Sequence, residues 1–299
     1  MKTKKKASLK TKITNKLDIY RLSDKEFLER KFKKKMGRVL DIDKAQTFSE
    51  KLQWLKLYYH KPIMTLMADK YGVRDLIRLT IGEKYLIPLW DVYTDLNNIS
   101  LENLPDSFIL KAVHGSGWNI ICYDKNDFNL EEFRKRFKNF MKYNYFRDSK
   151  EWVYKNITPR IVCERLILDK DGFPPKDYKI FCFNGEPTYI QVDSNKYRSQ
   201  MRNIYNLDWE LQPFRITYEN NHEIQLKPNK LDEMIDIARK FAVGFPFIRV
   251  DLYNLDNMIY FSEFTFYTDS GFNDVIPFEW EQKIGKMINL PQKGKVPNY

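Results

Sequence analysis

Apolar positions in the first quarter of the chain follow helical spacing. They recur every three or four residues at Phe48, Leu52, Leu55 and Tyr59, as on the buried face of a helix. Ser49 and Glu50 suit the start of that helix, and Pro62 ends it. The pattern predicts another helix from about Met64 to Leu79, so we expect residues 17 to 80 to be largely helical.

From Gly82 onward, short apolar segments bounded by turn formers replace this pattern, which is typical of buried strands. We expect strands at 86–90, 107–113, 119–123, 160–168, 178–183, 187–192, 203–205, 248–253 and 259–266. Asn184-Gly185 is a strong hairpin signal between two of them. Helices are expected at 130–143 and 231–243. The order of elements predicts an α+β protein in which helices pack on antiparallel sheets.

Composition narrows the class of protein. Hydrophobic residues make up 43% of the 299 positions and charged residues 30%, as in a soluble globular protein. We find no apolar stretch long enough to span a membrane and no secretory signal. The three cysteines, Cys122, Cys163 and Cys182, lack paired spacing, which argues against disulfides and zinc. We therefore expect a cytoplasmic protein.

The net charge of +11 is concentrated partly near the N-terminus. Lysines without any intervening acid stand at Lys2, Lys4, Lys5, Lys6, Lys10, Lys12 and Lys16. We favour a solvated, partly disordered leader. The alternative is peripheral contact with anionic lipid on the inner membrane face, at about 1 kcal/mol per basic residue. Nucleic acid ranks last, and we expect no such partner, because no nucleic-acid module is recognisable.

A lysine followed by a glycine turn forms the first candidate site. Lys111 lies in the apolar segment from Phe108 to Val113, and the turn from His114 to Gly117 follows at once. Glycines let backbone N–H groups close around phosphate oxygens, and an ammonium group neutralises their charge. The turn does not match the Walker pattern, and Gly-Ser-Gly alone is more often a plain hairpin turn.

The closing hairpin forms the second candidate site. Side chains alternate along a strand, so Arg249 and Asp251 share one face, as do Glu263 and Thr265. A three-residue connection at 255–257 predicts residue 251 opposite 261 and residue 249 opposite 263, with all four polar groups on one face. Two converging acids suit Mg²⁺ when phosphates supply its other ligands. By spacing alone, a surface hairpin with an Arg249–Glu263 ion pair is equally favoured.

Two further strands carry charges among apolar residues. Lys179 follows Asp177, and a structural ion pair between them is the simpler interpretation. Glu164 and Arg165 interrupt the segment from Ile161 to Ile167, which by itself means little. Nucleophilic catalysis has no support, since no serine or cysteine near His114 has a suitable third partner.

In this order the segments resemble the TupA-like branch of the ATP-grasp superfamily, over about residues 46 to 285. The most specific stretches are Phe48–Lys56, Ala68–Arg74, Leu110–Gly117, Asp177–Gly185, Arg249–Asp251 and Glu263–Phe266. The resemblance implies an ATP-grasp fold in which two α+β subdomains clasp the nucleotide. The expected parts are a basic helical leader at 1–45, an N-terminal subdomain at 46–105, a lid with the phosphate loop at 106–168 and a C-terminal subdomain with the metal site at 169–299.

The resemblance also implies roles for single residues. ATP would be bound by Lys70, Lys111, His114, Gly115, Ser116, Gly117, Glu164, Arg165, Leu166, Ile167, Asp171 and Lys179. Within this set Lys70 is expected on a helix, Glu164 near the adenine amine and Asp171 near the ribose. Lys179 and Arg249 match catalytic cations. Mg²⁺ would be bound by Asp251, Glu263 and Thr265, although many ATP-grasp ligases have asparagine at the position of Thr265.

The implied reaction is a carboxylate–amine ligation through an acyl-phosphate. It would attach an amino acid or peptide to a sugar of a capsular or cell-wall polysaccharide precursor. A kinase on the same scaffold, which phosphorylates a glycan hydroxyl, is the chief alternative. A glycosyltransferase is less favoured, because Asp41-Ile-Asp43 lies in the expected helical leader. A non-catalytic module that binds glycan or lipid is the alternative outside enzymes.

Overall fold

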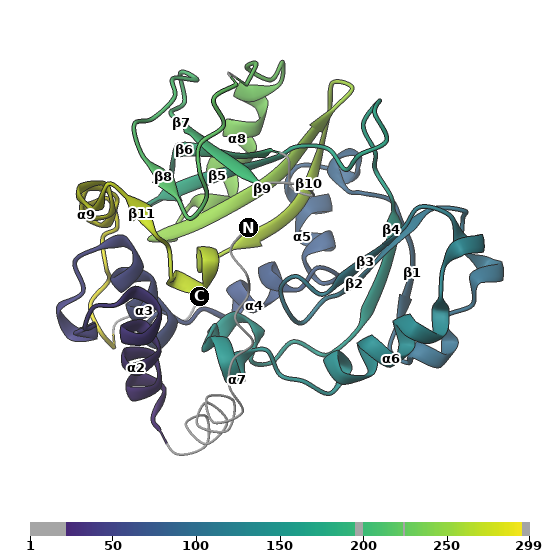
Figure 1. Ribbon diagram of the computed structural model, residues 1–299, viewed down its shortest axis with the longest axis horizontal. Coiled ribbons are helices and arrows are strands. Elements are labelled where there is room, and N and C mark those ends of the chain that lie inside the picture. Colours follow the sequence, from purple (N-terminus) through teal and green to yellow (C-terminus); the bar gives the residue numbers. More distant parts are fainter. Residues whose placement is uncertain (1–21, 195–199, 224, 295–299) are drawn as a thin grey trace.

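The computed structural model describes residues 22–194, 200–223 and 225–294. The described part has the expected α+β architecture, built on two antiparallel sheets that face each other across a cleft (Figure 1). Most of the lysine-rich leader, residues 1–21, lies outside the described residues, so its expected disorder and membrane contact stay predictions. No helix among the described residues is long and apolar enough to cross a bilayer.

The first sheet has four strands in the order β1-β4-β2-β3. Their bounds are Leu89–Tyr93 for β1, Phe108–Ala112 for β2, Asn119–Cys122 for β3 and Ile161–Arg165 for β4. Strand β1 comes from the segment expected to form the N-terminal subdomain, yet it pairs with β4. The sheet therefore draws on both sides of that expected boundary.

The second sheet has five strands in the order β10-β9-β5-β6-β7. Their bounds are Asp177–Phe183 for β5, Glu186–Ser194 for β6, Met201–Tyr205 for β7, Phe247–Leu255 for β9 and Met258–Thr265 for β10. Asn184 and Gly185 form the expected hairpin turn between β5 and β6, both with positive φ. A small third sheet pairs β8, Arg215–Ile216, with β11, Val275–Ile276.

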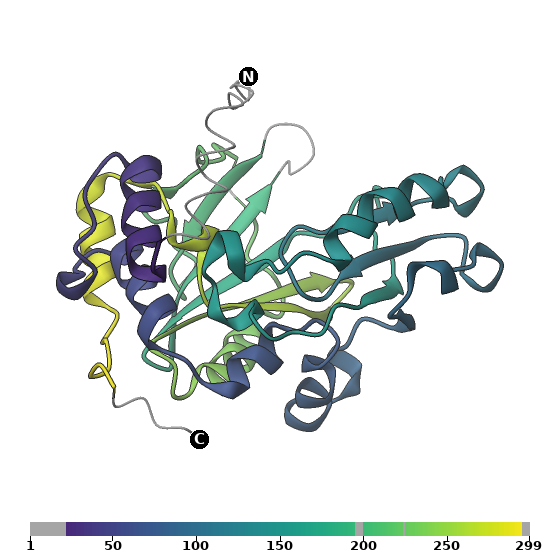
Figure 2. The same cartoon turned by 90° about the horizontal axis from the view of Figure 1, so that it is seen from below.

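Helices cover and connect the sheets. The α-helices are α2 Asp24–Met36, α3 Phe48–Tyr58, α4 Pro62–Ala68, α5 Val73–Thr80, α6 Leu130–Met141, α7 Phe146–Ser149, α8 Leu231–Ala242 and α9 Phe278–Lys286. The 3₁₀ turns are η1 Ile42–Lys44, η2 Glu83–Tyr85, η3 Leu96–Asn98, η4 Leu101–Asn103, η5 Lys125–Asp127, η6 Trp152–Tyr154 and η7 Thr268–Gly271. Thr47 and Glu50 form a capping box that starts α3. The N-terminal helices α2 and α3 lie beside α9, away from the four-stranded sheet (Figure 2).

The two faces of the five-stranded sheet differ. One face packs on α8, where Phe264 contacts Phe241. On the other face, Phe181 and Phe247 pack against Phe48 of α3, with ring centroids 6.4 and 5.3 Å apart. Farther along this second face the apolar rings give way to charged side chains. Helix α3 therefore covers one end of the face and leaves the charged end for the cleft.

The expected single helix at 64–79 is wrong, because a turn at residues 69–72 separates α4 from α5. The carboxylate of Asp69 accepts a hydrogen bond from the N–H of Tyr71, at 2.9 Å. Such a local bond competes with helical pairing. Lys70 consequently lies in a turn and not on a helix, and its side chain is directed at the cleft.

The expected register of the closing hairpin is also wrong. A two-residue turn joins β9 to β10, and a bulge after Phe261 shifts the pairing by one further residue. Asp251 therefore lies opposite Glu263, and Arg249 lies opposite Thr265. Without the bulge, Glu263 would point to the α8 face. The bulge thus places Arg249, Asp251, Glu263 and Thr265 on one face of the sheet. The sequence predicted this shared face correctly, although it predicted a different register.

Candidate functional site

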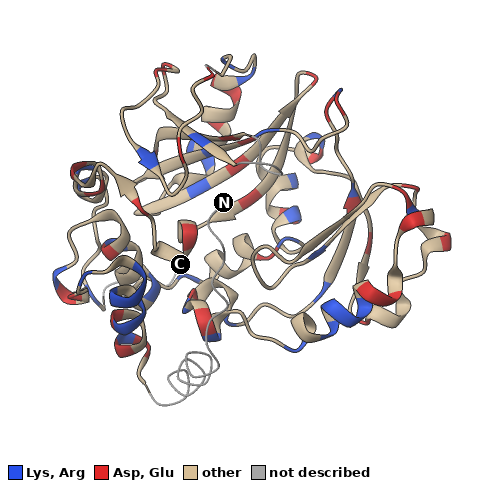
Figure 3. Cartoon of the chain, viewed as in Figure 1, with Lys and Arg blue, Asp and Glu red and all other residues tan. Residues whose placement is uncertain are grey.

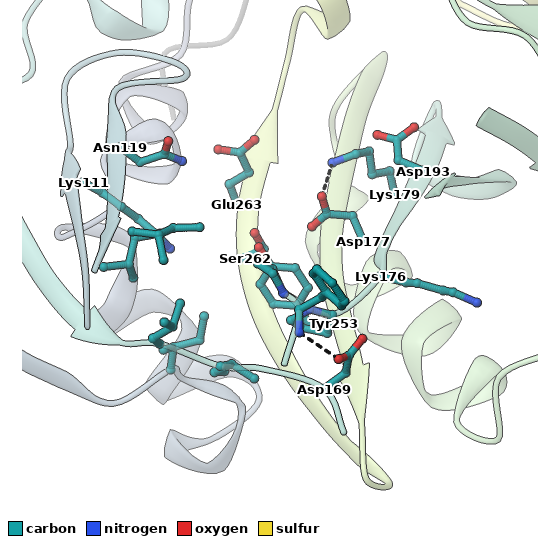
Figure 4. Close-up of a pocket in the computed structure, with 18 of the residues that line it drawn as sticks. Lys111, Asn119, Asp169, Lys176, Asp177, Lys179, Asp193, Tyr253, Ser262 and Glu263 are labelled. Atoms are coloured by element: carbon teal, nitrogen blue, oxygen red, sulfur yellow. Dashed lines mark hydrogen bonds and ion pairs between the residues drawn. The ribbon is translucent and has the colours of Figure 1, made fainter. Parts of the chain in front are cut away.

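A cavity of about 790 Å³ lies between the two sheets. Side chains from both sheets reach into it (Figure 4). Its charged and polar lining residues include Lys70, Lys111, Ser116, Asp169, Asp177, Lys179, Asp193, Ser262 and Glu263. In Figure 4, Lys111 and Asn119 approach from the four-stranded sheet, while Lys179 and Asp177 approach from the five-stranded sheet. Segments far apart in the sequence therefore share one site.

On the four-stranded sheet a buried acid holds two cations. The Nζ of Lys111 donates to Oε2 of Glu164 at 2.7 Å, and Arg74 donates to Oε1 at 3.2 Å. Lys111 lines the cavity, but Glu164 is not among the described residues that do. Glu164 therefore positions Lys111, and both of its oxygens are engaged by cations, while its expected contact with the adenine amine stays a prediction.

Aromatic rings pack against the glycine turn that follows β2. A Cβ added to Gly115 would approach the ring of Trp118 to 2.6 Å, so this position has no room for a side chain. His114 is buried beneath the turn, where its Nε2 contacts the carbonyl oxygen of Phe140 at 2.9 Å. Burial lowers the pKa of His114. Ser116 and Gly117 line the cavity, whereas His114 and Gly115 support the turn.

Lys70 connects the two halves of the site. Its Nζ donates to the carbonyl oxygen of Gly115 at 3.0 Å and lies 3.6 Å from the carboxylate of Glu263. The first partner belongs to the glycine turn and the second to β10. One lysine from the turn between α4 and α5 thus contacts both walls of the cavity.

On the five-stranded sheet a fully buried acid again holds two cations. Asp251 accepts two hydrogen bonds from Arg249, each of 2.7 Å, and one from Lys179 at 3.2 Å. Lys179 also lies 3.2 Å from Asp177, the ion pair that was the simpler interpretation. Burial alone would lower the pKa of Lys179, but these two carboxylates outweigh it and raise that pKa. The same balance of burial against Asp251 raises the pKa of Arg249.

The predicted metal ligands lie close together, but they differ in how exposed they are to the cavity. Glu263 faces the cavity with a third of its side chain exposed, whereas the carboxylate of Asp251 is buried behind Lys179. Thr265 accepts a hydrogen bond from Arg249 at 3.1 Å. Carboxylate and hydroxyl oxygens are donors that Mg²⁺ accepts. The donor set fits a hard divalent cation, with Glu263 the more accessible ligand and Asp251 in competition with its own cations.

The segment after β4 supplies the remaining wall. Arg165, Leu166 and Ile167 line the cavity as expected of a hinge. Asp171 is exposed in a turn and is not among the described lining residues. Asp169 lines the cavity instead and accepts the N–H groups of residues 171 and 173.

Some residues of the site were not predicted. Trp118 and Asn119, which had no expected role, line the cavity, and Arg74 holds Glu164.

Polar residues on α3 bind the turn after β10, namely Ser49, Gln53 and Lys56. These residues are spaced four and three positions apart, which places them on one face of the helix. Since buried polar groups need hydrogen-bond partners, this spacing could have predicted that α3 binds another polar segment.

The sequence matches the profile of the TupA-like ATPgrasp family over residues 50–289. The chain belongs to the TupA-like ATP-grasp family. The resemblance noted from the sequence motifs is thereby confirmed. A search of curated proteins gave no match.

Solved structures with a similar arrangement are distant in sequence. D-alanine–D-alanine ligase from Bacillus anthracis shares 16% identity over 75% of this chain and 65% of its own, with a TM-score of 0.44. The ATP-grasp ligase PsnB with minimal precursor shares 13% over 73% and 59%, with a TM-score of 0.38. The biotin carboxylase domain of 2-oxoglutarate carboxylase from Hydrogenobacter thermophilus shares 13% over 79% and 49%, with a TM-score of 0.40. This chain spans less than two thirds of each.

Proposed function

We propose that this ATP-grasp protein is an ATP- and Mg²⁺-dependent carboxylate–amine ligase. The observation that carries the proposal is the convergence of Lys70, Lys111 and Lys179 with Glu263 on one cavity, although they come from separate segments. Each of these lysines has a carboxylate neighbour, and three ammonium groups around one space still favour an anionic ligand that competes with those carboxylates. A triphosphate with its cation matches that charge.

The cavity has an apolar end and a cationic end. Ile87, Ile109 and Ile121 line it together with the hinge at 165–167, which suits a flat base. Lys70 and the glycine turn mark the other end, where Glu263 and Lys179 also lie. A nucleotide with its base at the hinge would thus direct its phosphates toward β10.

Asp251 and Glu263 would hold Mg²⁺, with Thr265 as a weaker oxygen donor. When bound, the ion neutralises charge on the phosphates. The chain's own cations would do the remaining work. Lys70 and Lys111 hold phosphate oxygens in place, and Arg249 and Lys179 provide positive charge at the reacting end. Alignment and charge neutralisation account for most of the catalysis in phosphoryl transfer.

The reaction proceeds in two transfers. A substrate carboxylate oxygen attacks the γ-phosphorus, and the bond to the β–γ bridging oxygen breaks to release ADP. An amine then attacks the acyl carbon, inorganic phosphate leaves, and the amine nitrogen loses its proton. From the resemblance to the TupA-like branch we infer an amino acid or peptide as one substrate and a capsular or cell-wall sugar as the other, in the cytoplasm.

The test is a turnover assay with ATP, Mg²⁺, a panel of sugar acids and a panel of amino acids. We expect ADP release that needs both a carboxylate and an amine, a product with the mass of the amide, and a hydroxamate when hydroxylamine replaces the amine. Glu263→Gln should lower kcat at least about a hundredfold, as loss of a group that stabilises the transition state does. The matched control, Glu279→Gln on the exposed surface of α9, should retain activity.

Other results of this assay would identify a different function. Phosphate transferred to a sugar hydroxyl without any amine would identify a kinase. Glycan binding that survives Asp251→Ala and Glu263→Ala, without ATP turnover, would identify a binding module.

A further inference from the structure

The segment from Phe48 to Lys56 carries three buried polar residues that the proposed reaction does not use. Ser49, Gln53 and Lys56 lie on one face of α3 and are almost fully buried. Buried polar groups destabilise a fold unless they find hydrogen-bond partners. All three donate to backbone carbonyl oxygens in residues 270–273, the segment after β10. One helix face thus serves one distant segment of the chain.

That segment contains a strained turn. Asp269 and Ser270 of η7 have φ angles of 47° and 56°, in the left-handed region. Such residues persist only where their surroundings enforce them. Gln53 donates to the carbonyl oxygens of Ser270 and Gly271, at 3.2 and 2.6 Å, and Lys56 donates to that of Ser270 at 2.7 Å. The side chains of α3 therefore help to fix the conformation of η7.

The first residue of the same turn binds Arg249. The hydroxyl group of Thr268, which is fully buried, accepts a hydrogen bond from Nη1 of Arg249 at 2.8 Å. Asp251 accepts from Nε and Nη2 of the same guanidinium group, each at 2.7 Å. Because a guanidinium group is planar and rigid, acceptors at two of its edges fix its position and its plane.

Arg249 lies directly behind the acids at the cavity. It is not among the described lining residues, but its Nη2 lies 4.0 Å from the carboxylate of Glu263, which does line the cavity. On β9 one basic and one acidic position lie beside the acidic position of β10 (Figure 3). A change in the direction of the guanidinium group would therefore alter the charge at this end of the cavity.

Ser49 reaches Thr268 by a second route. Its hydroxyl group donates to the carbonyl oxygen of Asn273 at 3.2 Å, and the side-chain amide of Asn273 donates to the carbonyl oxygen of Thr268 at 3.2 Å. Both routes from α3 thus end at the residue that holds Arg249.

We propose that Ser49, Gln53 and Lys56 are positioning residues for Arg249. They fix η7, the turn fixes Thr268, and Thr268 fixes the guanidinium group at the end of the cavity where the terminal phosphate is expected. The three residues touch neither the nucleotide nor the metal. This inference rests on the proposed function, which places Arg249 at the reacting end, and it gives the conserved-length contact between α3 and η7 a part in that reaction.

The same helix provides a matched control. Lys51 donates to the carbonyl oxygen of Ile288 at 2.8 Å, and no hydrogen bond joins it to η7 among the described residues. Lys51→Met and Lys56→Met therefore each remove one bond from α3 to a backbone carbonyl, but only the second removes a bond to the turn.

The test measures binding of Mg²⁺–ADP and of the Mg²⁺ complex of adenylyl imidodiphosphate, a non-hydrolysable ATP analogue, to the full chain. Only the analogue has a terminal phosphate. Thr268→Val should weaken binding of the analogue about tenfold, as expected for a lost hydrogen bond to a charged group, and leave ADP binding unchanged. Thr268→Ser keeps the hydroxyl group and should restore the affinity of the unchanged protein.

Lys56→Met should act in the same direction, by about fivefold, because its effect reaches Arg249 through the turn. Lys51→Met should leave the affinities for both nucleotides unchanged. Gln53→Met replaces Lys56→Met if that variant does not fold. In an Arg249→Lys background, Thr268→Val and Lys56→Met should have no further effect, since residues that act through one group are not additive.

The outcomes are distinguishable. A loss confined to the analogue, absent in Thr268→Ser and Lys51→Met and abolished by Arg249→Lys, supports the inference. Equal losses for ADP and the analogue, an equal effect of Lys51→Met, or effects that persist in Arg249→Lys overturn it and leave the ligase proposal intact. An unchanged protein that binds neither nucleotide overturns the ligase proposal and this inference together.

Discussion

The two sheets bring the same charge arrangement to the cavity in different surroundings. In each, one carboxylate holds two cations: Glu164 holds Lys111 and Arg74, and Asp251 holds Lys179 and Arg249. The five-stranded sheet buries its carboxylate almost completely, at 1% side-chain exposure, against 8% in the four-stranded sheet. Each group places a lysine at the cavity and its acid behind it.

The two sheets also differ in the size of their hydrophobic cores. The five-stranded sheet shares a large core with α3, α8 and α9, whereas the four-stranded sheet has a separate small core with α6. Elements with few buried apolar contacts open at lower free energy than the rest of a protein. The comparison suggests a fixed wall that carries the metal ligands and a more easily displaced wall that carries the phosphate turn.

The largest expected effect comes from breaking the buried charge group. Asp251→Asn leaves Arg249 and Lys179 without their shared anion in a buried place, so we expect it to lower the free energy of unfolding by about 3–5 kcal/mol. Glu164→Gln, the matched change in the four-stranded sheet, should cost less, because water is nearer. Urea denaturation of both variants measures the difference, and equal losses would contradict the comparison.

An intermediate effect should come from the two cores. Phe137→Leu alters the core of the four-stranded sheet and Phe181→Leu that of the five-stranded sheet, each at a cost of about 1–2 kcal/mol. We expect Phe137→Leu to speed hydrogen exchange in β2 and β3 but not in β5 and β9. Phe181→Leu should speed exchange throughout the chain. Identical exchange patterns would show that the two walls open together.

The smallest expected effect is a change in the slope of the free energy of unfolding against pH, which arises at Lys56 on the helix that covers one end of the five-stranded sheet. Burial lowers the pKa of Lys56 to about 7, from an ordinary value of 10.5, and burial raises the pKa of Glu151 beside it. Between pH 7 and 10.5 the unfolded chain therefore binds more protons at Lys56 than the folded chain. This group makes the free energy of unfolding rise with pH there, by at most about 1.4 kcal/mol per pH unit.

Lys56→Met should reduce that rise, and denaturation curves between pH 7 and 9 measure it. Lys33→Met, which changes an exposed lysine, should keep the slope of the unchanged protein. An unchanged slope in Lys56→Met would show that Lys56 is not desolvated in the folded chain.

Much of the fold could be predicted from local pattern. Helix α3, the Asn184-Gly185 hairpin and the antiparallel strands follow from spacing and turn chemistry, which depend on neighbouring residues alone. The break between α4 and α5 was missed because a side-chain bond from Asp69 outweighs the apolar pattern. The hairpin register was missed because a bulge cannot be read from alternation.

The sequence by itself determined the family, the α+β class and several of the charged residues near the cavity, among them Lys70, Lys111, Lys179 and Glu263. Tertiary structure decided which of them reach it. Lys111 lines the cavity while Glu164 positions it, and Asp169 lines the cavity whereas Asp171 does not, because strand pairing and local turns set the direction of each side chain.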